Sequence, residues 1–346
     1  MGAPLKKALQ YLVSVALMVA FALLAIEGTD LTALWASLLT VSPAWLLVIT
    51  GTTVLTLVLR AWRWVVLMRS FAPSVTVFDA GRALSICYAA NVFVPRSGEL
   101  LRALSLKWSR GTNISSVLGT VVVERILDVV WLLIFVGISI LLHRERIFSA
   151  FSWIGWFSLT ILACCALALV VLVLVSVYRD RALVAIEAGI SRLSLRLANA
   201  VVRLMDMFLQ GITALHTPSA YLEIALSSVL LNVGYVIIVY EGFASVGLSP
   251  DWNAAIVVMA LSAIGMSIPS PGGIGSYHYF FMQGLVLLYA VDEDPALACA
   301  IVVHGVANVT YLALGLPALL LQRWRPPGAG PDVDRKVSGA APNQAP

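Results

Sequence analysis

Charged residues are scarce in this sequence. Only 12% of its 346 residues are Asp, Glu, Lys or Arg, whereas 60% are hydrophobic. A soluble domain usually carries about 25% charged residues, and a single water-soluble core of this size has no room for so much apolar surface. The scarcity excludes an ordinary soluble domain and predicts a protein whose main solvent is lipid.

Cysteine-based motifs are also missing. The four cysteines (Cys87, Cys164, Cys165 and Cys299) all lie in apolar runs, and the sequence has no CxxC pair and no Cys/His ligand spacing. We therefore expect small apolar side chains, with no metal and no cofactor. The net charge of +4 comes from basic residues spread along the loops, so no nucleic-acid partner is expected.

What the sequence does contain is a set of long apolar runs. They cover residues 8–26, 43–68, 113–142, 153–177, 221–246 and 295–321. Each run is long enough to cross a bilayer as a helix. The sequence therefore predicts an all-α polytopic membrane protein with about six spanning helices. No cleavage site of small residues follows the first run, so we interpret it as a retained helix.

Two further apolar regions, 75–110 and 252–291, are interrupted near their centres. The first break reads Pro95-Arg96-Ser97-Gly98, and the second spans residues 269–275 and contains the glycines Gly272, Gly273 and Gly275. Proline ends a helix and glycine permits the turn that follows. We interpret both regions as re-entrant helical hairpins, whose tips lie at membrane depth inside protein or a wet cavity.

The same order of elements occurs twice, in halves at about 43–142 and 221–321. In both halves a Pro-x-x-Gly break is followed about 20 residues later by a spanning helix. Chance and shared lipid-facing composition are the alternative explanation of this weak similarity. With a cytoplasmic N-terminus, nearly all basic residues fall on the cytoplasmic side. The two hairpins then open to opposite sides, which predicts inverted repeats of the kind found in alternating-access transporters.

The remaining segments complete the expected organisation. We expect a membrane domain over 1–325 in the inner (plasma) membrane, with both termini in the cytoplasm. The segment 179–215 alternates arginine with apolar residues, which suits a helix on the membrane surface or, equally, a cytoplasmic linker helix. Residues 326–346 are rich in Pro, Gly and Ala and predict a disordered cytoplasmic tail.

Polar residues inside the apolar runs are the candidate site, because a charge at the bilayer centre normally faces a cavity or a partner. The helix 113–142 contains Glu124, Arg125 and Asp128, and their spacing places the two acids on one face. The first interrupted region adds four more candidates, Asn91, Arg96, Glu99 and Arg102. Arginines suit an oxyanion, and the acids would orient them. The alternative is an internal ion-pair network that locks helices and moves nothing.

The second interrupted region supplies uncharged candidates. Its glycines precede a helix start, where free N–H groups and the positive end of the dipole favour anions. His278 and His304 either join the same cavity or serve as structural histidines bonded to the backbone. Arg60 and Arg63, beside two tryptophans at one end of the run 43–68, are interpreted as interfacial anchors.

Four segments together resemble a known family. They are RAWRWVVLMR at 60–69, NVFVPRSGELLRALSLK at 91–107, VVVERILDVVWLL at 121–133 and IPSPGGIGSYHYFF at 268–281. They are similar to the lysylphosphatidylglycerol synthase transmembrane-domain family, the flippase-like membrane proteins. The resemblance covers about residues 10–322. It implies an inner-membrane protein that moves, or helps to move, a lipid with a polar head between leaflets.

The resemblance has limits that bear on the cargo. Members of the family are associated with aminoacylated phosphatidylglycerol, polyisoprenyl-linked sugars or hopanoid lipids. The family often has an acidic residue soon after PGGxG, where this chain has Tyr277 and His278, and often has Arg where His304 stands. The second half of the site therefore carries a different charge, which puts an identical cargo in doubt.

Three functions are compatible with these patterns. The first is a flippase for a phospholipid, polyisoprenyl lipid or hopanoid with a polar or anionic headgroup. The second is a membrane enzyme acting on a lipid-linked sugar or phosphate, with Glu99 and Glu124 as acid and base. No catalytic motif supports it, so we expect no enzyme. The third is a non-transporting partner of a lipid- or glycan-synthesising membrane enzyme.

Overall fold

The fold is described from a computed structural model. It describes residues 3–156, 218–249 and 251–322, together with scattered residues between 158 and 202. These parts of the chain are helical and contain no strand. The helices are α1 (Ala3–Ile26), α2 (Leu31–Leu39), α3 (Pro43–Met68), α4 (Val77–Phe93), α5 (Gly98–Arg110), α6 (Ile114–Ala150), α10 (Pro218–Ser245), α11 (Trp252–Ser267), η1 (Pro271–Gly273), α12 (Ser276–Tyr289) and α13 (Glu293–Leu320).

The expected all-α membrane architecture is confirmed. Among the described residues, α1, α3, α6, α10 and α13 are long and apolar enough to cross a membrane. The expected run 113–142 corresponds to a longer helix, α6, which has a non-helical residue at His143. The short helix α2 was not among the elements expected from the sequence. The expected spanning helix 153–177, the surface segment 179–215 and the tail 326–346 lie largely or wholly outside the described residues.

Both interrupted regions form helical hairpins. In the first, α4 ends at Phe93 and α5 begins at Gly98. A Cβ atom at Gly98 would overlap the backbone carbonyl of Cys87, so only glycine lets the start of α5 pack this closely on α4. In the second, α11 is followed by the short helix η1 and then α12. The Pro- and Gly-containing breaks therefore mark the positions where the helices end.

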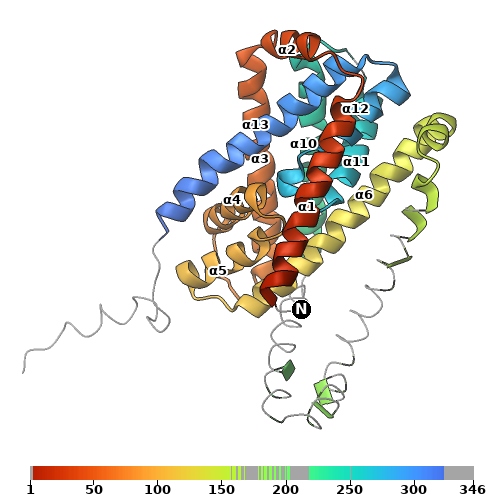
Figure 1. Cartoon of the computed structure of the whole chain (residues 1–346). Coiled ribbons are helices and arrows are strands. Elements are labelled where there is room, and N and C mark those ends of the chain that lie inside the picture. The colour runs from red at the N-terminus through yellow and green to blue at the C-terminus, as the bar shows by residue number, and fades with distance from the viewer. Residues whose placement is uncertain are drawn as a thin grey trace, which may run out of the picture.

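Two runs of four helices follow the same order: α3, α4, α5, α6 and then α10, α11, α12, α13. Their hairpins point in opposite directions (Figure 1). The base of the first hairpin is closed by an ion pair of 2.8 Å between Arg110 and Asp79. It lies at the end of the bundle where the chain begins, and we call this end the N-terminal pole. The base of the second lies at the opposite pole, where Arg146 Nη1 donates to the Leu288 carbonyl at 2.9 Å.

The two runs are interlocked. The long helix α13 packs on α4 of the first hairpin, α6 packs on α11 of the second, and α3 packs along α10. The hairpin tips meet, because η1 packs on α4 and the ideal Cβ position of Gly272 lies 3.4 Å from the Val92 Cα atom. This contact lies between the two poles of the bundle.

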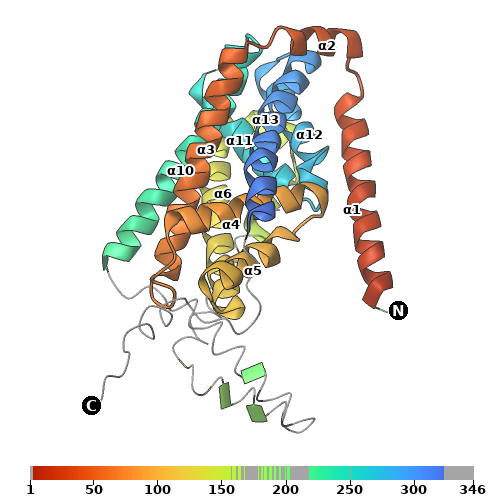
Figure 2. The ribbon, with the colours of Figure 1, turned by 90° about the vertical axis from the view of Figure 1, so that its left-hand side faces the viewer.

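The first helix covers the second hairpin from outside. α1 stands at the edge of the bundle (Figure 2) and packs on α12 and η1. Gly275 has a φ of +84°, which favours glycine. A Cβ atom there would also overlap the α1 backbone at Met18. The glycine-rich turn thus permits both the sharp change of direction and the close approach of α1.

Candidate functional site

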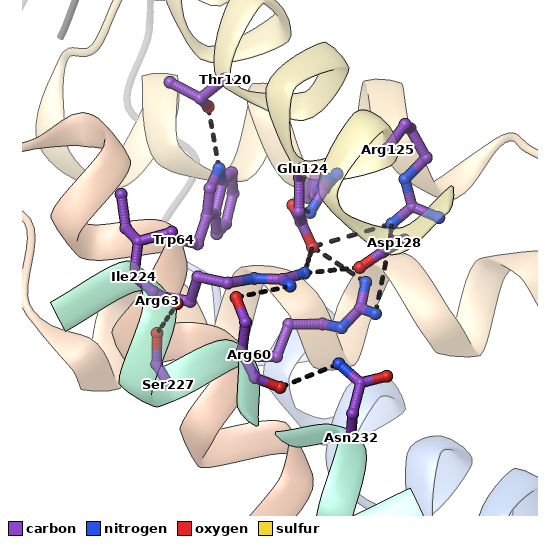
Figure 3. Close-up of polar contacts among 12 residues, drawn as sticks. Arg60, Arg63, Trp64, Thr120, Glu124, Arg125, Asp128, Ile224, Ser227 and Asn232 are labelled. Atoms are coloured by element: carbon purple, nitrogen blue, oxygen red, sulfur yellow. Dashed lines mark hydrogen bonds and ion pairs between the residues drawn. The ribbon is translucent and has the colours of Figure 1, made fainter. Parts of the chain in front are cut away.

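A cluster of buried charges lies where the first hairpin meets the long helices (Figure 3). We call it the central cluster. It consists of Arg60 and Arg63 from α3, Arg102 from α5, and Glu124, Arg125 and Asp128 from α6.

Glu124 is the centre of this cluster and is fully buried. Its Oε1 atom accepts from Arg60 Nη1 at 2.9 Å, and its Oε2 atom accepts from Arg102 Nη1 at 2.8 Å. Arg63 and Arg125 approach Oε1 at 3.6 and 3.7 Å. One carboxylate on α6 therefore holds arginines from α3 and α5, which fixes the hairpin relative to two spanning helices.

Asp128, one turn further along α6, provides the second acid. Its Oδ1 atom accepts from Arg63 Nη2 at 2.7 Å and its Oδ2 atom from Arg60 Nη2 at 3.2 Å. Arg125 Nη2 lies 3.3 Å from Oδ2. The Arg125 side chain is 49% exposed, so it marks the open side of the central cluster.

Positive charge is in excess. Four guanidinium groups face two carboxylates, which leaves two positive charges uncompensated within the central cluster. Arg102 is 1% exposed, and its Nε and Nη2 atoms are buried with no hydrogen-bond partner among the described residues. Burying unpaired donors of a charged group is costly. These donors are suited to an anion, which no described residue supplies to them.

The aromatic neighbour Trp64 positions Arg102. The guanidinium carbon of Arg102 lies 4.7 Å from the centre of the Trp64 ring, a distance at which the cation and the ring attract each other. The indole N–H donates to Thr120 Oγ1 at 2.9 Å, which fixes the ring. One carboxylate and one aromatic ring thus hold Arg102, while its Nε and Nη2 atoms keep no hydrogen-bond partner among the described residues.

The interpretation of Arg60 and Arg63 as interfacial anchors is wrong. Arg63 is fully buried and Arg60 is 7% exposed, and both bind the acids of α6. Residues three or four positions apart lie on the same helical face, so Arg60 and Arg63 share one face of α3 as Glu124 and Asp128 share one face of α6. That match was the signal available in the sequence. The position of the two arginines near the end of an apolar run favoured the interpretation as interfacial anchors instead.

The residues at the first hairpin tip take different roles from those expected. Asn91 Oδ1 accepts from the Gly98 N–H at 2.8 Å, so the chain itself occupies a donor expected to be free. Arg96 is exposed in the turn between α4 and α5. Glu99 makes no ion pair with a described residue, and its Oε2 atom is buried without a partner there. The expectation that Glu99 orients the arginines is therefore not met, whereas Glu124 and Asp128 do bind them.

The second hairpin tip is a neutral cluster. His278 Nδ1 accepts from the Gly275 N–H at 3.3 Å, which is the structural role considered for it. His304 is buried, lies 3.2 Å from Asn308 Nδ2 through Nε2, and stacks on the Tyr277 ring at 4.5 Å between centroids. The two histidine rings are 4.9 Å apart. Gly272 and Gly273 lie in the turn beside them.

A metal centre is not formed by these groups. Within the described part of the chain, no group of three or more His, Cys, Asp or Glu side chains is placed to hold a metal ion. The chemistry that the central cluster offers is the binding of an anion by several oriented guanidinium donors in a site with little water.

Comparison with known families agrees with this architecture. Residues 11–315 match the family described as the lysylphosphatidylglycerol synthase TM region. The chain belongs to this family. The match includes the central cluster and both hairpins, so the family identifies the chain as a lipid-related membrane protein. No curated protein and no solved structure gives a significant match.

Proposed function

We propose that this chain moves a membrane lipid with a polar or anionic headgroup between the two leaflets. The observation that carries the proposal is the excess of buried arginine in the central cluster, together with the unpartnered Nε and Nη2 atoms of Arg102. A lipid headgroup with an oxyanion satisfies those donors, and its acyl chains remain in the bilayer outside.

We further propose that the two runs of four helices are inverted repeats and that their hairpins are re-entrant. The equal order of elements and the opposite directions of the hairpins support this (Figure 1). The N-terminal pole carries Arg69, Arg82, Lys107 and Arg110. The opposite pole carries Asp30 and Asp294, which are joined through the Asp30 N–H at 2.9 Å. By the positive-inside rule the N-terminal pole is cytoplasmic, in the inner (plasma) membrane.

The contact between the hairpin tips is the proposed barrier. Gly272 of one tip lies against Val92 near the other, so a headgroup passing from one side to the other needs the tips to separate. Rocking of one half against the other along α3 and α10 would expose the central cluster to each side in turn. In this mechanism the ion pairs of Glu124 keep the arginines oriented throughout.

The proposal is tested with purified full-length protein in liposomes that contain a fluorescent phospholipid in both leaflets. A membrane-impermeant quencher applied outside bleaches half of the fluorescence when lipids stay in place and nearly all of it when they exchange. We expect near-complete bleaching with the protein. Bleaching that stops at half, as in protein-free liposomes, contradicts the proposal.

A disulfide lock tests the barrier in the same assay. Val92→Cys with Gly272→Cys, in a chain whose four native cysteines are replaced, is expected to form a cross-link that stops lipid movement until a reductant is added. The single Val92→Cys variant, treated identically, is the control. Lipid movement that continues with the tips linked would show that the path does not run between them.

The same preparation separates transport from the other two functions. We expect no chemical change in the headgroup of any lipid supplied, which mass spectrometry of the extracted lipids measures. A lipid- or glycan-synthesising membrane enzyme remains a proposed partner that supplies or consumes the cargo. Stable co-purification with such an enzyme, without lipid movement by the isolated chain, favours the role of a non-transporting partner.

A further inference from the structure

Glu241 is a buried acid that takes no part in the central cluster. It lies on α10 near the end of the helix at Ser245, toward the opposite pole, and is 7% exposed. Its Oε1 atom accepts from the Thr52 hydroxyl of α3 at 2.7 Å. Its Oε2 atom is buried with no hydrogen-bond partner among the described residues. One oxygen of this carboxyl group therefore has nothing in the described chain to stabilise a negative charge.

The helices around Glu241 bring no cation to it. α10 packs on α3, α11 and α13, and none of α10, α11 and α13 contains a lysine or an arginine. The two arginines of α3, Arg60 and Arg63, bind the acids of α6. Where α11 and α13 begin, near the opposite pole, the charged residues are all acids: Asp251, Glu293 and Asp294. Glu241 accordingly makes no ion pair with a described residue.

The uncharged titratable groups on these helices do not change that balance. Tyr240 stacks on the tryptophan that begins α11, with the ring centroids 4.1 Å apart. Cys299 of α13 lies against the neighbouring Gly242. His304, further along α13, is engaged with Asn308 at the second hairpin tip. None of these groups supplies a positive charge to the acid.

The helices pack tightly around this acid. A Cβ atom at Gly234 would lie 2.6 Å from Thr56 Cγ2 of α3, and one at Gly242 would overlap the Val303 side chain of α13. Such close packing leaves little room for water or a counter-ion between the helices. An ionised carboxylate is very costly to bury without either, whereas a protonated carboxyl group is neutral and far less costly.

We infer that Glu241 is a proton-binding site that couples lipid movement to pH. The proton is bound while α3 and α10 are packed together. Its loss leaves a buried charge, which favours separation of the two helices and entry of water. α3 belongs to the first run and α10 to the second, and the proposed rocking takes place along them. The coupling rests on the proposed function, whereas the proton site itself does not.

The proton cycle needs no other reactant. When the helices separate toward the opposite pole, the carboxyl group of Glu241 gives its proton to water and becomes a hydrated carboxylate. When they pack again, the carboxylate takes a proton back from water and loses its charge. Acid therefore favours the packed arrangement, and alkali favours the opened one.

The coupling is tested by measuring lipid movement against pH in the liposome quenching assay. The probe is phosphatidylglycerol, whose phosphodiester keeps one negative charge from about pH 5 to about pH 9, a range that covers the titration of buried carboxyl groups. We expect exchange by the unmodified protein to rise at least about tenfold across this range, because the ionised fraction rises about tenfold for each pH unit below the midpoint.

Three variants assign the pH dependence to this residue. Glu241→Gln keeps an acceptor for the Thr52 hydroxyl but cannot ionise, so its exchange is expected to stay slow at every pH. Glu241→Asp keeps a titrating group and should restore the rise. Glu223→Gln changes the acid near the other end of α10 and should follow the unmodified protein. A Glu241→Gln profile that rises as steeply as that of the unmodified protein overturns the coupling.

Infrared difference spectroscopy detects the proton without any lipid movement. A neutral carboxyl group has a carbonyl band that a carboxylate lacks. In the full chain reconstituted in lipid, we expect a band from a poorly hydrated carboxyl group at acidic pH, lost as the pH rises and absent from Glu241→Gln. Identical spectra for the unmodified protein and Glu241→Gln overturn the proton site.

A sodium ion is the alternative occupant of the free oxygen. It is tested at constant pH by replacing Na⁺ with a bulky organic cation in the liposome assay. We expect no change in exchange. A dependence on Na⁺ that disappears in Glu241→Gln would assign the site to sodium and overturn the proton assignment.

The proton site and the proposed function can fail separately. A carboxyl band that belongs to Glu241, in a protein that moves no lipid at any pH, contradicts the proposed function and leaves the proton site standing. Lipid movement with the same pH profile in the unmodified protein and in Glu241→Gln contradicts this inference and leaves the proposed function standing.

Discussion

The two runs of helices share an order of elements but not a chemistry. In α3 to α6, Glu124 is surrounded by arginines. In α10 to α13, the buried acid Glu241 accepts a single hydrogen bond from the Thr52 hydroxyl at 2.7 Å, and its Oε2 atom has no partner among the described residues. The second hairpin tip holds only uncharged polar groups, including His278 and His304.

This difference indicates a division of roles between halves of similar architecture. The first run holds the charge that would bind a headgroup, and the second packs the ring of Tyr311 on Tyr88 of the first hairpin, with the ring centroids 4.5 Å apart. Under the proposed function, a cargo held mainly by one half would stay bound while the other half moves past it. The asymmetry predicts that matched substitutions in the two halves have unequal effects.

The largest difference in stability is expected between Glu124→Gln and Glu241→Gln. The first leaves the buried guanidinium groups of Arg60 and Arg102 short of negative charge, which costs about 3–5 kcal/mol. The second keeps an acceptor for Thr52 and costs less than about 1 kcal/mol. Reversible unfolding in detergent measures both. Equal costs would show that the charges of the first run are not needed for the fold.

The hairpin turns offer the next comparison. Gly275→Ala forces an alanine to a φ of +84° and against the backbone of α1, so a loss of about 2 kcal/mol is expected. Gly305→Ala is the control, because a Cβ there meets nothing within 4 Å. The same unfolding assay applies. A neutral Gly275→Ala variant would mean that α1 does not pack closely on this turn.

Capping at the two tips should have smaller effects. Asn91→Ala removes the acceptor of the Gly98 N–H, at 2.8 Å, and His278→Ala removes that of the Gly275 N–H, at 3.3 Å. Each substitution is expected to lower the free energy of unfolding by about 1 kcal/mol. Asn91→Ala, which removes the shorter hydrogen bond, should have the larger effect. If His278→Ala leaves stability intact but abolishes lipid movement, the histidine acts on the cargo and is not a structural cap.

The smallest effect is expected for Arg125→Ala. Its side chain is half exposed, with ion pairs of 3.3 and 3.7 Å to Asp128 and Glu124, and exposed pairs contribute about 0–1 kcal/mol. Thermal unfolding should therefore shift little. A cost as large as that of Glu124→Gln would place Arg125 inside the network and not at its open side.

Much of the fold could be predicted from the sequence because lipid imposes simple rules. An apolar run of bilayer length is a helix, and a break with proline and glycine ends one, as Pro95 after α4 and Pro269 after α11 show. The short helix α2 was missed because its nine residues fall below any length signal. The pairing of α13 with α4 and of α6 with α11 is a tertiary choice that one sequence does not reveal.

The site was harder to predict because the partners of a side chain depend on the depth of its helix in the membrane and on the rotation of that helix about its axis. The spacing of Glu124 and Asp128 identified their shared face, yet the sequence does not tell which arginines reach it. Arg102 does, Arg96 is exposed in its turn, and Arg60 and Arg63 were misinterpreted as anchors. Asn91 was predicted to bind the substrate because the sequence does not show its hydrogen bond with the Gly98 N–H. That bond forms only when the turn between α4 and α5 brings the two residues together.

The central claim is that the buried arginines of the first run carry the headgroup. Two arginines, each paired with a glutamate, test it directly. Arg102 Nη1 binds the buried Glu124 at 2.8 Å, and the exposed Arg69 binds Glu223 through Nη2 at 2.8 Å. In the liposome quenching assay, we predict that Arg102→Gln slows exchange of an anionic phospholipid at least about tenfold, while Arg69→Gln matches the unmodified protein. Equal exchange by both folded variants would contradict the account.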